Sequence, residues 1–169
     1  MVQTETLLGM FAGGPLFVSG RCVDALHRGA GCARCADVCP VGAIACGAGA
    51  ASIDQTACLG CGACIAECPT EAIGTRSSQR PLHLAVADAP GDGPLAVACP
   101  RSGAGVSSMP VVRHERCLAA LGPDELLDLA GDPPRHLWLD DSACGTCEFG
   151  HHQDPNALAA QAANDLRRA

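Results

Sequence analysis

The chain has 169 residues, of which 13 are cysteine and only four are aromatic. This length suits one large or two small domains, and a core with so few aromatic rings needs another source of stability, which bound metal can supply. All 11 basic residues are arginine, against 18 acidic residues, so the formal net charge is −7. Such an acidic chain argues against nucleic-acid binding and favours a partner with a basic docking face.

Residues 1–21 are predicted to form an apolar N-terminal arm. No basic residue precedes the apolar stretch 7–18, and no run of about 18 apolar residues occurs, so we expect neither a secretory signal nor a membrane span. The arm either folds over the protein's own next domain or docks on a partner subunit. So many cysteines without a secretory signal are typical of metal binding in the cytoplasm, where we expect this protein to be located.

Residues 22–80 contain the most informative motif, the run CLGCGACIAECP at Cys58–Pro69. Its spacing is typical of iron–sulfur ligation, in which a short loop wraps three corners of a cluster and the fourth ligand comes from elsewhere. Gly60 and Gly62 allow the loop to curl tightly. A disulfide scaffold or a zinc knuckle is the alternative, but both usually pair their cysteines rather than present four within eleven residues.

A similar run, CARCADVCP, lies upstream at Cys32–Pro40, and both runs continue to an isoleucine, Ile44 and Ile73. Internal duplication of this kind indicates two half-units that complete each other's sites. The glycine-rich stretch 45–56 between the runs is predicted to form a β-hairpin.

Over about residues 22–73 these motifs resemble the bacterial two-cluster ferredoxins. The resemblance implies an α+β fold with a pseudo-symmetric domain that holds two [4Fe–4S] clusters. It implies that one cluster is bound by Cys39, Cys58, Cys61 and Cys64. It implies that the other is bound by Cys32, Cys35, Cys68 and one further ligand.

That further ligand is open, because the residue three positions before Cys32 is Gly29 instead of the family's cysteine. The nearest candidate is Cys22, since a longer loop can still return a thiolate to the site at little extra entropic cost. The alternatives are a three-cysteine site with a [3Fe–4S] cluster and ligation by His27. Cys46 lies outside these sets and is expected to be a small buried hydrophobic residue near the hairpin.

Residues 81–150 are predicted to form a small α/β domain with a helix at 118–130. Its strands are expected at 82–87, 94–98, 110–113 and 136–139. Cysteines follow the later strands at Cys99, Cys117, Cys144 and Cys147. The carboxyl ends of neighbouring parallel strands gather at one edge of a sheet, so these four thiolates are predicted to converge on a third metal centre.

Two alternatives stay open for this third centre. The cysteines are also common as separate buried core residues, and Cys144-x-x-Cys147 also fits zinc or a dithiol redox pair. The arrangement weakly resembles the small iron–sulfur subunit of methyl-viologen-reducing hydrogenases, which also spreads its cluster cysteines over strand ends. Trp138 and Phe149 are the aromatic residues expected in this domain's core.

The remaining candidates carry less information. His151 and His152 are interpreted as a surface pair, and His114 as a substitute ligand only if one of the four cysteines fails. Asp140 and Asp141 are expected to end a strand, and residues 151–169 to form a helical tail. We find no phosphate-binding glycine loop and no hydrolase or metalloprotease motif, so we expect no substrate site.

The sequence therefore predicts an electron-transfer protein and not an enzyme in itself. We expect an iron–sulfur subunit of a multi-subunit cytoplasmic oxidoreductase, with two [4Fe–4S] clusters and a third cluster of the [4Fe–4S] or [2Fe–2S] type. Its partner would be the catalytic subunit, in a hetero-oligomer without a membrane span. The alternative is a metal-stabilised interaction protein or redox sensor, with zinc in the C-terminal site.

Overall fold

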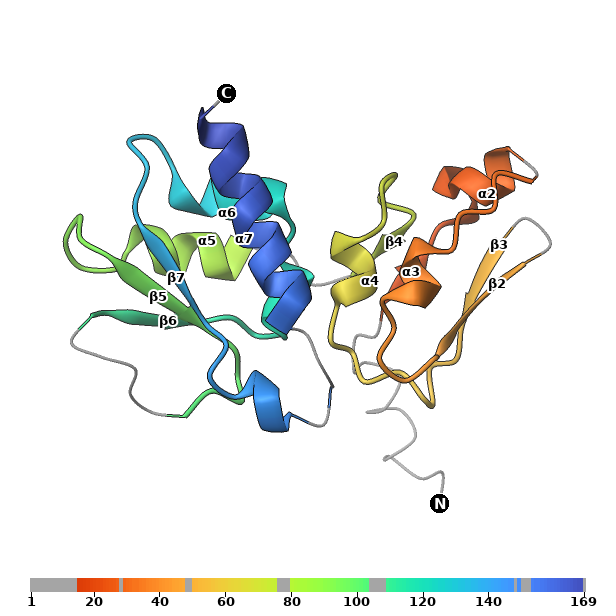
Figure 1. Ribbon diagram of the computed structural model, residues 1–169, viewed down its shortest axis with the longest axis horizontal. Helices are drawn as coiled ribbons and strands as arrows, with labels where there is room; N and C mark the ends of the chain where they lie inside the picture. Colours follow the sequence, from red (N-terminus) through yellow and green to blue (C-terminus); the bar gives the residue numbers. More distant parts are fainter. Residues whose placement is uncertain are drawn as a thin grey trace, which may run out of the picture.

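The computed structural model describes residues 15–27, 29–47, 50–75, 80–103, 109–147, 149 and 153–168. Two halves lie side by side (Figure 1). The N-terminal half, residues 15–75, consists of short helices and two-stranded sheets, whereas the C-terminal half, residues 80–168, is built on a three-stranded sheet. Most of the predicted arm, residues 1–14, lies outside the described residues.

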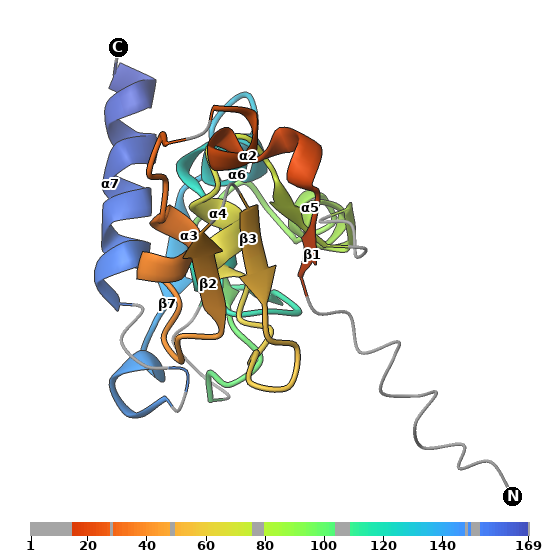
Figure 2. The same cartoon turned by 90° about the vertical axis from the view of Figure 1, so that its right-hand side faces the viewer.

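Helices of a single turn and short strands make up the N-terminal half. In chain order they are β1 (Leu16–Phe17), η1 (Ser19–Arg21), α2 (Val23–Leu26), α3 (Arg34–Asp37), β2 (Ile44–Gly47), β3 (Ala50–Ile53), α4 (Ala63–Ala66) and β4 (Ile73–Gly74). Strands β2 and β3 pair antiparallel and lie side by side in Figures 1 and 2, which confirms the hairpin predicted at 45–56.

The described end of the arm packs on the protein itself. Phe17 of β1 lies opposite Ile73 of β4 in an antiparallel pair, and the Val18 amide donates to the carbonyl of Ala72 at 2.7 Å. Ile73 is 1% exposed and forms a small core with Ile44, the matching residue of the first cysteine run. Only four described residues of this core are buried, and three cysteines pack against it, so its apolar contribution to stability is smaller than that of a full domain core.

The C-terminal half is a sheet with helices on one face. In chain order its elements are α5 (Arg80–Ala87), β5 (Leu95–Ala98), β6 (Val111–Arg113), η2 (Leu118–Ala120), α6 (Pro123–Ala130), β7 (Leu137–Asp140), η3 (Cys144–Thr146) and α7 (Gln153–Arg168). The strand order is β6-β5-β7, and β5 pairs parallel with both neighbours. The three strands predicted at 94–98, 110–113 and 136–139 are thereby confirmed.

The strand predicted at 82–87 is wrong, because this segment is helix α5. Leu82 and Val86 are buried one helical turn apart, at 4% and 7% exposure, whereas Leu84 is 52% exposed. In a strand all three side chains would share a face, so the alternation of the sequence suggested the wrong period. Pro81 also fits the first turn of a helix, because backbone N–H groups there have no carbonyl partner within the helix, so a residue without an N–H loses no hydrogen bond.

The predicted helix 118–130 is divided into η2 and α6. Gly122 keeps an extended backbone between them, and Pro123 then begins α6. The tail helix is confirmed as α7, although its side chains are described only in part. Within the described parts of the chain, no helix is both long and apolar enough to cross a bilayer.

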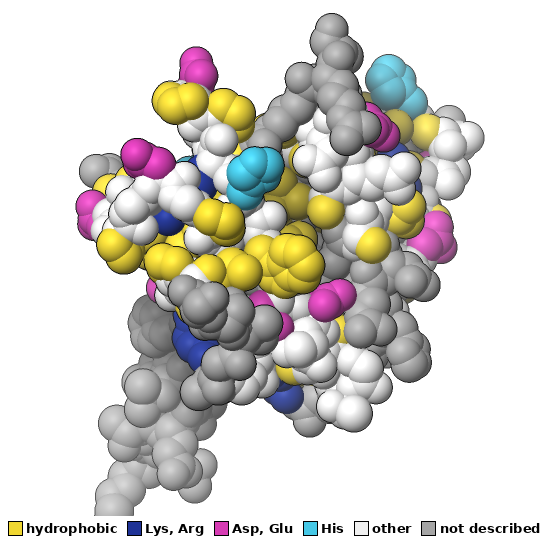
Figure 3. All heavy atoms as spheres, turned by 60° about the vertical axis from the view of Figure 1, so that its left-hand side comes forward, with side chains coloured by type: hydrophobic (Ala, Val, Ile, Leu, Met, Phe, Trp, Pro, Cys, Tyr) yellow, Lys and Arg dark blue, Asp and Glu magenta, His cyan; other side chains and the backbone are white. Residues whose placement is uncertain are grey.

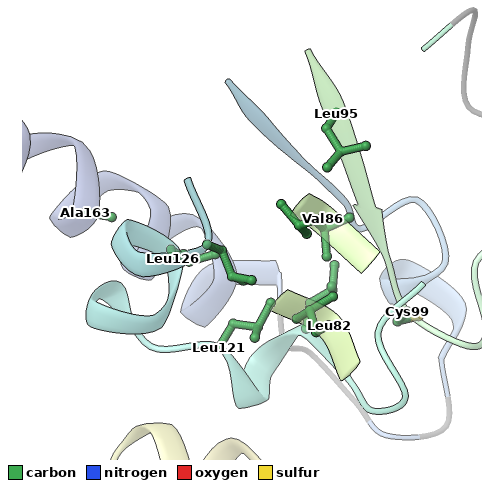
Figure 4. Close-up of a cluster of buried hydrophobic side chains, with 10 residues drawn as sticks. Leu82, Val86, Leu95, Cys99, Leu121, Leu126 and Ala163 are labelled. Atoms are coloured by element: carbon green, nitrogen blue, oxygen red, sulfur yellow. The ribbon is translucent and has the colours of Figure 1, made fainter. Parts of the chain in front are cut away.

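One face of the sheet and helices α5, α6 and α7 enclose the main core. Leu95 and Val97 of β5 are completely buried there, together with Leu82, Leu126 and Ala163 from the helices (Figure 4). Alternation along strands places these side chains on one face of the sheet and their neighbours on the other.

The opposite face of the sheet leaves large apolar side chains in contact with solvent. Val111, Ala96 and Trp138 form a row across the three strands, and Trp138 is 59% exposed. The expectation that Trp138 belongs to the core is therefore wrong. Figure 3, seen from the side of the C-terminal half, shows hydrophobic side chains gathered across that side of the molecule.

The two halves touch where α4 of the first meets η2 of the second. A Cβ built on Gly62 would lie only 2.6 Å from the Cβ of Ala120, so the backbones approach at this point as closely as glycine allows. Nearby, the Arg116 guanidinium donates to the hydroxyl of Thr75.

A pair of substitutions tests the helical assignment of α5. We expect Leu82→Ala to lower the free energy of unfolding by about 2–5 kcal/mol, because it leaves a cavity in the main core. Leu84→Ala, on the solvent side, should change it by less than about 0.5 kcal/mol. Chemical denaturation followed by circular dichroism measures both, and equal losses would contradict the helix.

Candidate metal centres

Four of the predicted ligands of the irregular site, together with Cys46, line a single cavity of the N-terminal half. Its volume is about 20 Å³, so the side chains are closely packed. The cysteines that line it are Cys22, Cys32, Cys35, Cys46 and Cys68. We call this group site one.

A folded loop between η1 and α3 brings Cys22 to site one. The carboxylate of Asp24 accepts a hydrogen bond from the Gly31 amide at 3.0 Å, which draws the two ends of the loop together. Pairing of β1 with β4 fixes the start of this loop beside the residues that follow Cys68. His27, the alternative ligand, is exposed, and it is not among the residues that line the cavity.

Cys46 was expected to be buried and to lie outside the ligand groups, and both expectations are wrong. It is exposed instead of buried, and its Sγ lies 3.7 Å from the Sγ of Cys35. Burial, followed by the contact with Cys46, raises the pKa of the Cys35 thiol to about 12. The register of the β2–β3 hairpin puts Cys46 there, and the linear sequence shows no sign of that register.

The four cysteines of the other predicted ferredoxin cluster are also brought together, and we call them site two. Burial, followed by the charges of the other three members, Cys61, Cys58 and Cys39, raises the pKa of the Cys64 thiol to about 12. Thiols held in this way stay protonated at neutral pH unless a metal ion supplies compensating positive charge.

Backbone amides donate to sulfur at equivalent places in the two cysteine runs. The Ala43 amide donates to Cys39 Sγ and the Ala72 amide to Cys68 Sγ, both at 3.2 Å. Such bonds favour the thiolate form of a ligand and tune the potential of a bound cluster. At Cys68, burial opposes this effect, but the bonds from Thr70, Ile73 and Ala72 outweigh it and lower the pKa of the thiol.

The turns that carry these amides share an unusual backbone. Gly42 has φ of 61°, and Glu71, at the same position of the second turn, has φ of 52°. A left-handed conformation suits glycine, whereas it strains a residue with a Cβ. Both turns therefore bend back sharply enough for an amide to reach the sulfur four residues earlier.

The third predicted group lies at the carboxyl edge of the three-stranded sheet, and we call it site three. It surrounds a cavity of about 240 Å³. Its cysteines are Cys99, Cys117, Cys144 and Cys147, of which only Cys147 is not buried. All three strands run parallel, so the loops that follow them meet at this edge, as the sequence predicted.

A hydrogen-bond network that the sequence did not suggest fixes the loops of site three. The Arg113 guanidinium donates to the carbonyls of Cys99 and Ser102 at 3.2 and 2.9 Å. The Ser102 hydroxyl donates to the Asp140 carbonyl at 3.0 Å, and the Asp140 carboxylate accepts from the Ser142 amide and hydroxyl. The predicted role of Asp140 at the strand end is confirmed.

The electrostatics of site three resemble those of site two. Burial, followed by charges on Cys117, Asp141 and Cys99, raises the pKa of the Cys144 thiol to about 11. Arg101 and Arg116 also line the cavity and supply positive charge. The guanidinium of Arg101 also stacks over the ring of Phe149, 4.0 Å from its centroid.

His114 is buried close to Cys117. Burial, the largest cause, lowers the pKa of its imidazole. His151 and His152 lie outside the described residues. Among the residues that are described, no three His, Cys, Asp or Glu side chains are close enough to hold a single metal ion.

Sites two and three adjoin each other across the contact between the halves. Cys61 of site two and Cys117 of site three belong to one hydrophobic cluster with Ala63 and Ala119. Leu59 and Gly60, in the site-two loop, also line the site-three cavity. Sites one and two are likewise joined, because Cys35 and Cys68 pack in the same small core as Cys39 and Cys64.

Comparison with known proteins identifies the type of site in the N-terminal half. Residues 51–74 match the 4Fe-4S binding domain family. A stretch of 46 residues, 27% of the chain, is 50% identical to one component of the ion-translocating oxidoreductase complex of Methanosarcina acetivorans, and it spans 17% of that protein. No solved structure matches the chain. The N-terminal half therefore contains a ferredoxin-like iron–sulfur segment with at least one [4Fe–4S] cluster.

Substitution of Cys22 tests the irregular ligand of site one. We expect Cys22→Ser to weaken or convert only the cluster at site one, because hydroxyl oxygen is a poor replacement for thiolate on iron. Electron paramagnetic resonance of the reduced protein should retain the signal from site two. An unchanged spectrum would exclude Cys22 as a ligand, and Cys22→Ala serves as the control without any oxygen donor.

Proposed function

We propose that this protein is an electron-transfer subunit of an oxidoreductase complex and carries three iron–sulfur clusters. The observation that supports the proposal best is the convergence of twelve cysteines into three groups of four. The matching amide bonds to Cys39 and Cys68 support a dicluster ferredoxin-type arrangement for two of these groups, as expected from the two cysteine runs.

The residues of each site fit an iron–sulfur cluster. Thiolates are the ligands of such clusters, and the amides of Ala43, Ala72 and Gly60 point at ligand sulfurs, the last at 3.4 Å from Cys58 Sγ. Sites one and two would each hold a [4Fe–4S] cluster, and site three a [4Fe–4S] or [2Fe–2S] cluster. A bound cluster supplies one-electron redox chemistry, which the side chains named here do not.

The arrangement of the sites favours a relay. Site one adjoins site two through the core around Ile44 and Ile73, and site two adjoins site three through Cys61 and Cys117. The three sites therefore follow one another through the molecule. One end of this row, beside the exposed Cys46, and the other, at site three beside the half-buried Cys147, are the two places where redox partners would approach.

We propose a catalytic subunit as the partner and the cytoplasm as the location. The similarity to a component of an ion-translocating oxidoreductase complex supports membership of a multi-subunit redox assembly. The net charge of −7 favours a partner whose docking face is basic. The reacting substrate would bind to the partner, since no catalytic motif occurs in this sequence.

Metal content is the decisive measurement. Anaerobically purified protein should contain about 12 irons per chain if all three clusters are [4Fe–4S], or about 10 if site three holds [2Fe–2S]. Iron near eight with one zinc would contradict the third cluster and support the alternative, a zinc-stabilised interaction or sensor protein. Absorption in the visible range should bleach on reduction.

The contact between sites two and three yields a matched pair of variants. Gly60 and Gly62 lie in one loop with φ of 67° and 89°, so alanine at either position strains the backbone similarly. Only Gly62→Ala also places a Cβ against Ala120, whereas Gly60→Ala meets nothing within 4 Å.

We therefore expect Gly62→Ala to lower the melting temperature more than Gly60→Ala does, and to slow reduction of site three while site two is reduced normally. Differential scanning calorimetry and rapid-freeze paramagnetic resonance measure the two effects. Equal behaviour of the two variants would show that the contact between the halves does not matter for either property.

A further inference from the structure

Site one has five cysteines for a cluster that needs four ligands. Cys22, Cys32, Cys35 and Cys68 account for the four, and Cys46 lines the same cavity without a role in that set. The fifth thiol is the strongest feature of the molecule that the proposed function leaves unexplained.

The hairpin directs Cys46 toward the site. Ile44 and Cys46 lie two residues apart on β2, so their side chains share one face of the hairpin, and Ile44 is buried in the small core between sites one and two. The cross-strand partner of Cys46 is Ala51, which is buried in the same core. Cys46 nevertheless remains exposed, so its side chain has room to move.

The contact between the sulfur atoms of Cys35 and Cys46 shows that Cys46 lies at the position of Cys35 in site one. At 3.7 Å, the Sγ atoms of Cys35 and Cys46 are within hydrogen-bond distance for thiols, so both face the same corner of the cavity. Cys35 approaches from α3 and Cys46 from β2, and these two elements pack against each other. When Cys35 is bound to iron as a thiolate, the Cys46 thiol is the partner that donates the hydrogen bond.

We propose that Cys46 is a second thiol ligand for the iron that Cys35 binds at site one, so that either cysteine can complete the site. The inference rests on the proposed function, because it requires a cluster at site one. In the exchange, the Cys46 thiol releases its proton to water and its sulfur forms a bond to iron, while the bond from Cys35 to the same iron breaks and the Cys35 thiolate takes up a proton from water. No electron is transferred, so no oxidant or reductant is needed.

The two forms of the site would differ in their surroundings. Cys35 is half-buried and Cys46 is exposed, and solvent exposure of a ligand changes the potential of a cluster. A site that can use either thiol also keeps its four irons when one of the two is oxidised or alkylated.

Three single substitutions and one double substitution test the proposal. Cys46→Ala should retain the iron content and the paramagnetic signals of the unchanged protein, and Cys35→Ala should retain the iron content and a [4Fe–4S] signal at site one. Cys35→Ala combined with Cys46→Ala should lose about one to four irons per chain and the [4Fe–4S] signal of site one. Cys32→Ala is the control at a neighbouring ligand and should resemble the double variant.

Alkylation provides a second measurement that does not depend on cluster signals. With Cys35 present, iodoacetamide should modify the exposed Cys46 thiol, and peptide mass spectrometry locates the label. In Cys35→Ala, Cys46 should be protected, because its sulfur is bound to iron.

The outcomes separate the inference from the proposed function. If Cys35→Ala loses its cluster or fails to fold as Cys32→Ala does, or if Cys46 in it is still alkylated, the inference is wrong while the iron content of the unchanged protein still supports the proposed function. If the unchanged protein contains no iron at all, the proposed function itself fails.

Discussion

Thiols that are buried together without a compensating charge form the constraint on which this structure depends. A buried thiolate is costly, and several beside one another repel, so in sites two and three the pKa values of Cys64 and Cys144 rise to about 12 and 11. Only a positively charged centre lets all members of a site ionise. Since the cores of the N-terminal half are small, the free energy of metal binding is also free energy of folding there.

The same constraint explains why apolar side chains stabilise one part of the molecule, whereas backbone amides and polar turns position the cysteines in another. Large apolar residues fill the core of the C-terminal half, where Leu95 and Val97 are completely buried, whereas the core around Ile44 and Ile73 in the N-terminal half is smaller. Elsewhere the chain places amides beside sulfur, as at Ala43 and Ala72, and uses polar turns such as those at Asp24 and Asp140 to hold loops in position. Contacts of this kind leave little trace in a hydrophobic pattern.

The grouping of cysteines could be predicted from sequence where it depends on local spacing or on parallel strands. In the run at 58–69, the spacing of the cysteines along one short loop is enough to bring them together. Strands β5, β6 and β7 are parallel, so the cysteines that follow them reach the same edge of the sheet whatever the details of packing. Features that depend on long-range register could not be predicted. The contact of Cys46 with Cys35 arises from pairing across the hairpin, and the return of Cys22 depends on β1 pairing with β4. Helix α5 was missed because the spacing of Leu82 and Val86 fits both the two-residue period of a strand and the 3.6-residue period of a helix. Only the exposure of Leu84 between them distinguishes the helix from the strand.

The left-handed backbone of Glu71 is strained, whereas that of Gly42, at the same position of the other turn, is not. This difference bears on the order in which the two sites would take up iron. Gly42 adopts its turn without strain, so the turn that brings the Ala43 amide to Cys39 has no backbone strain to overcome. The corresponding turn beside Cys68 has to hold a glutamate in a conformation that costs about 1–2 kcal/mol, and its bond from Ala72 to sulfur helps to maintain it. If both sites hold clusters as proposed, we expect site two to fill first and site one to follow, and we expect the reverse order of loss during oxidative damage.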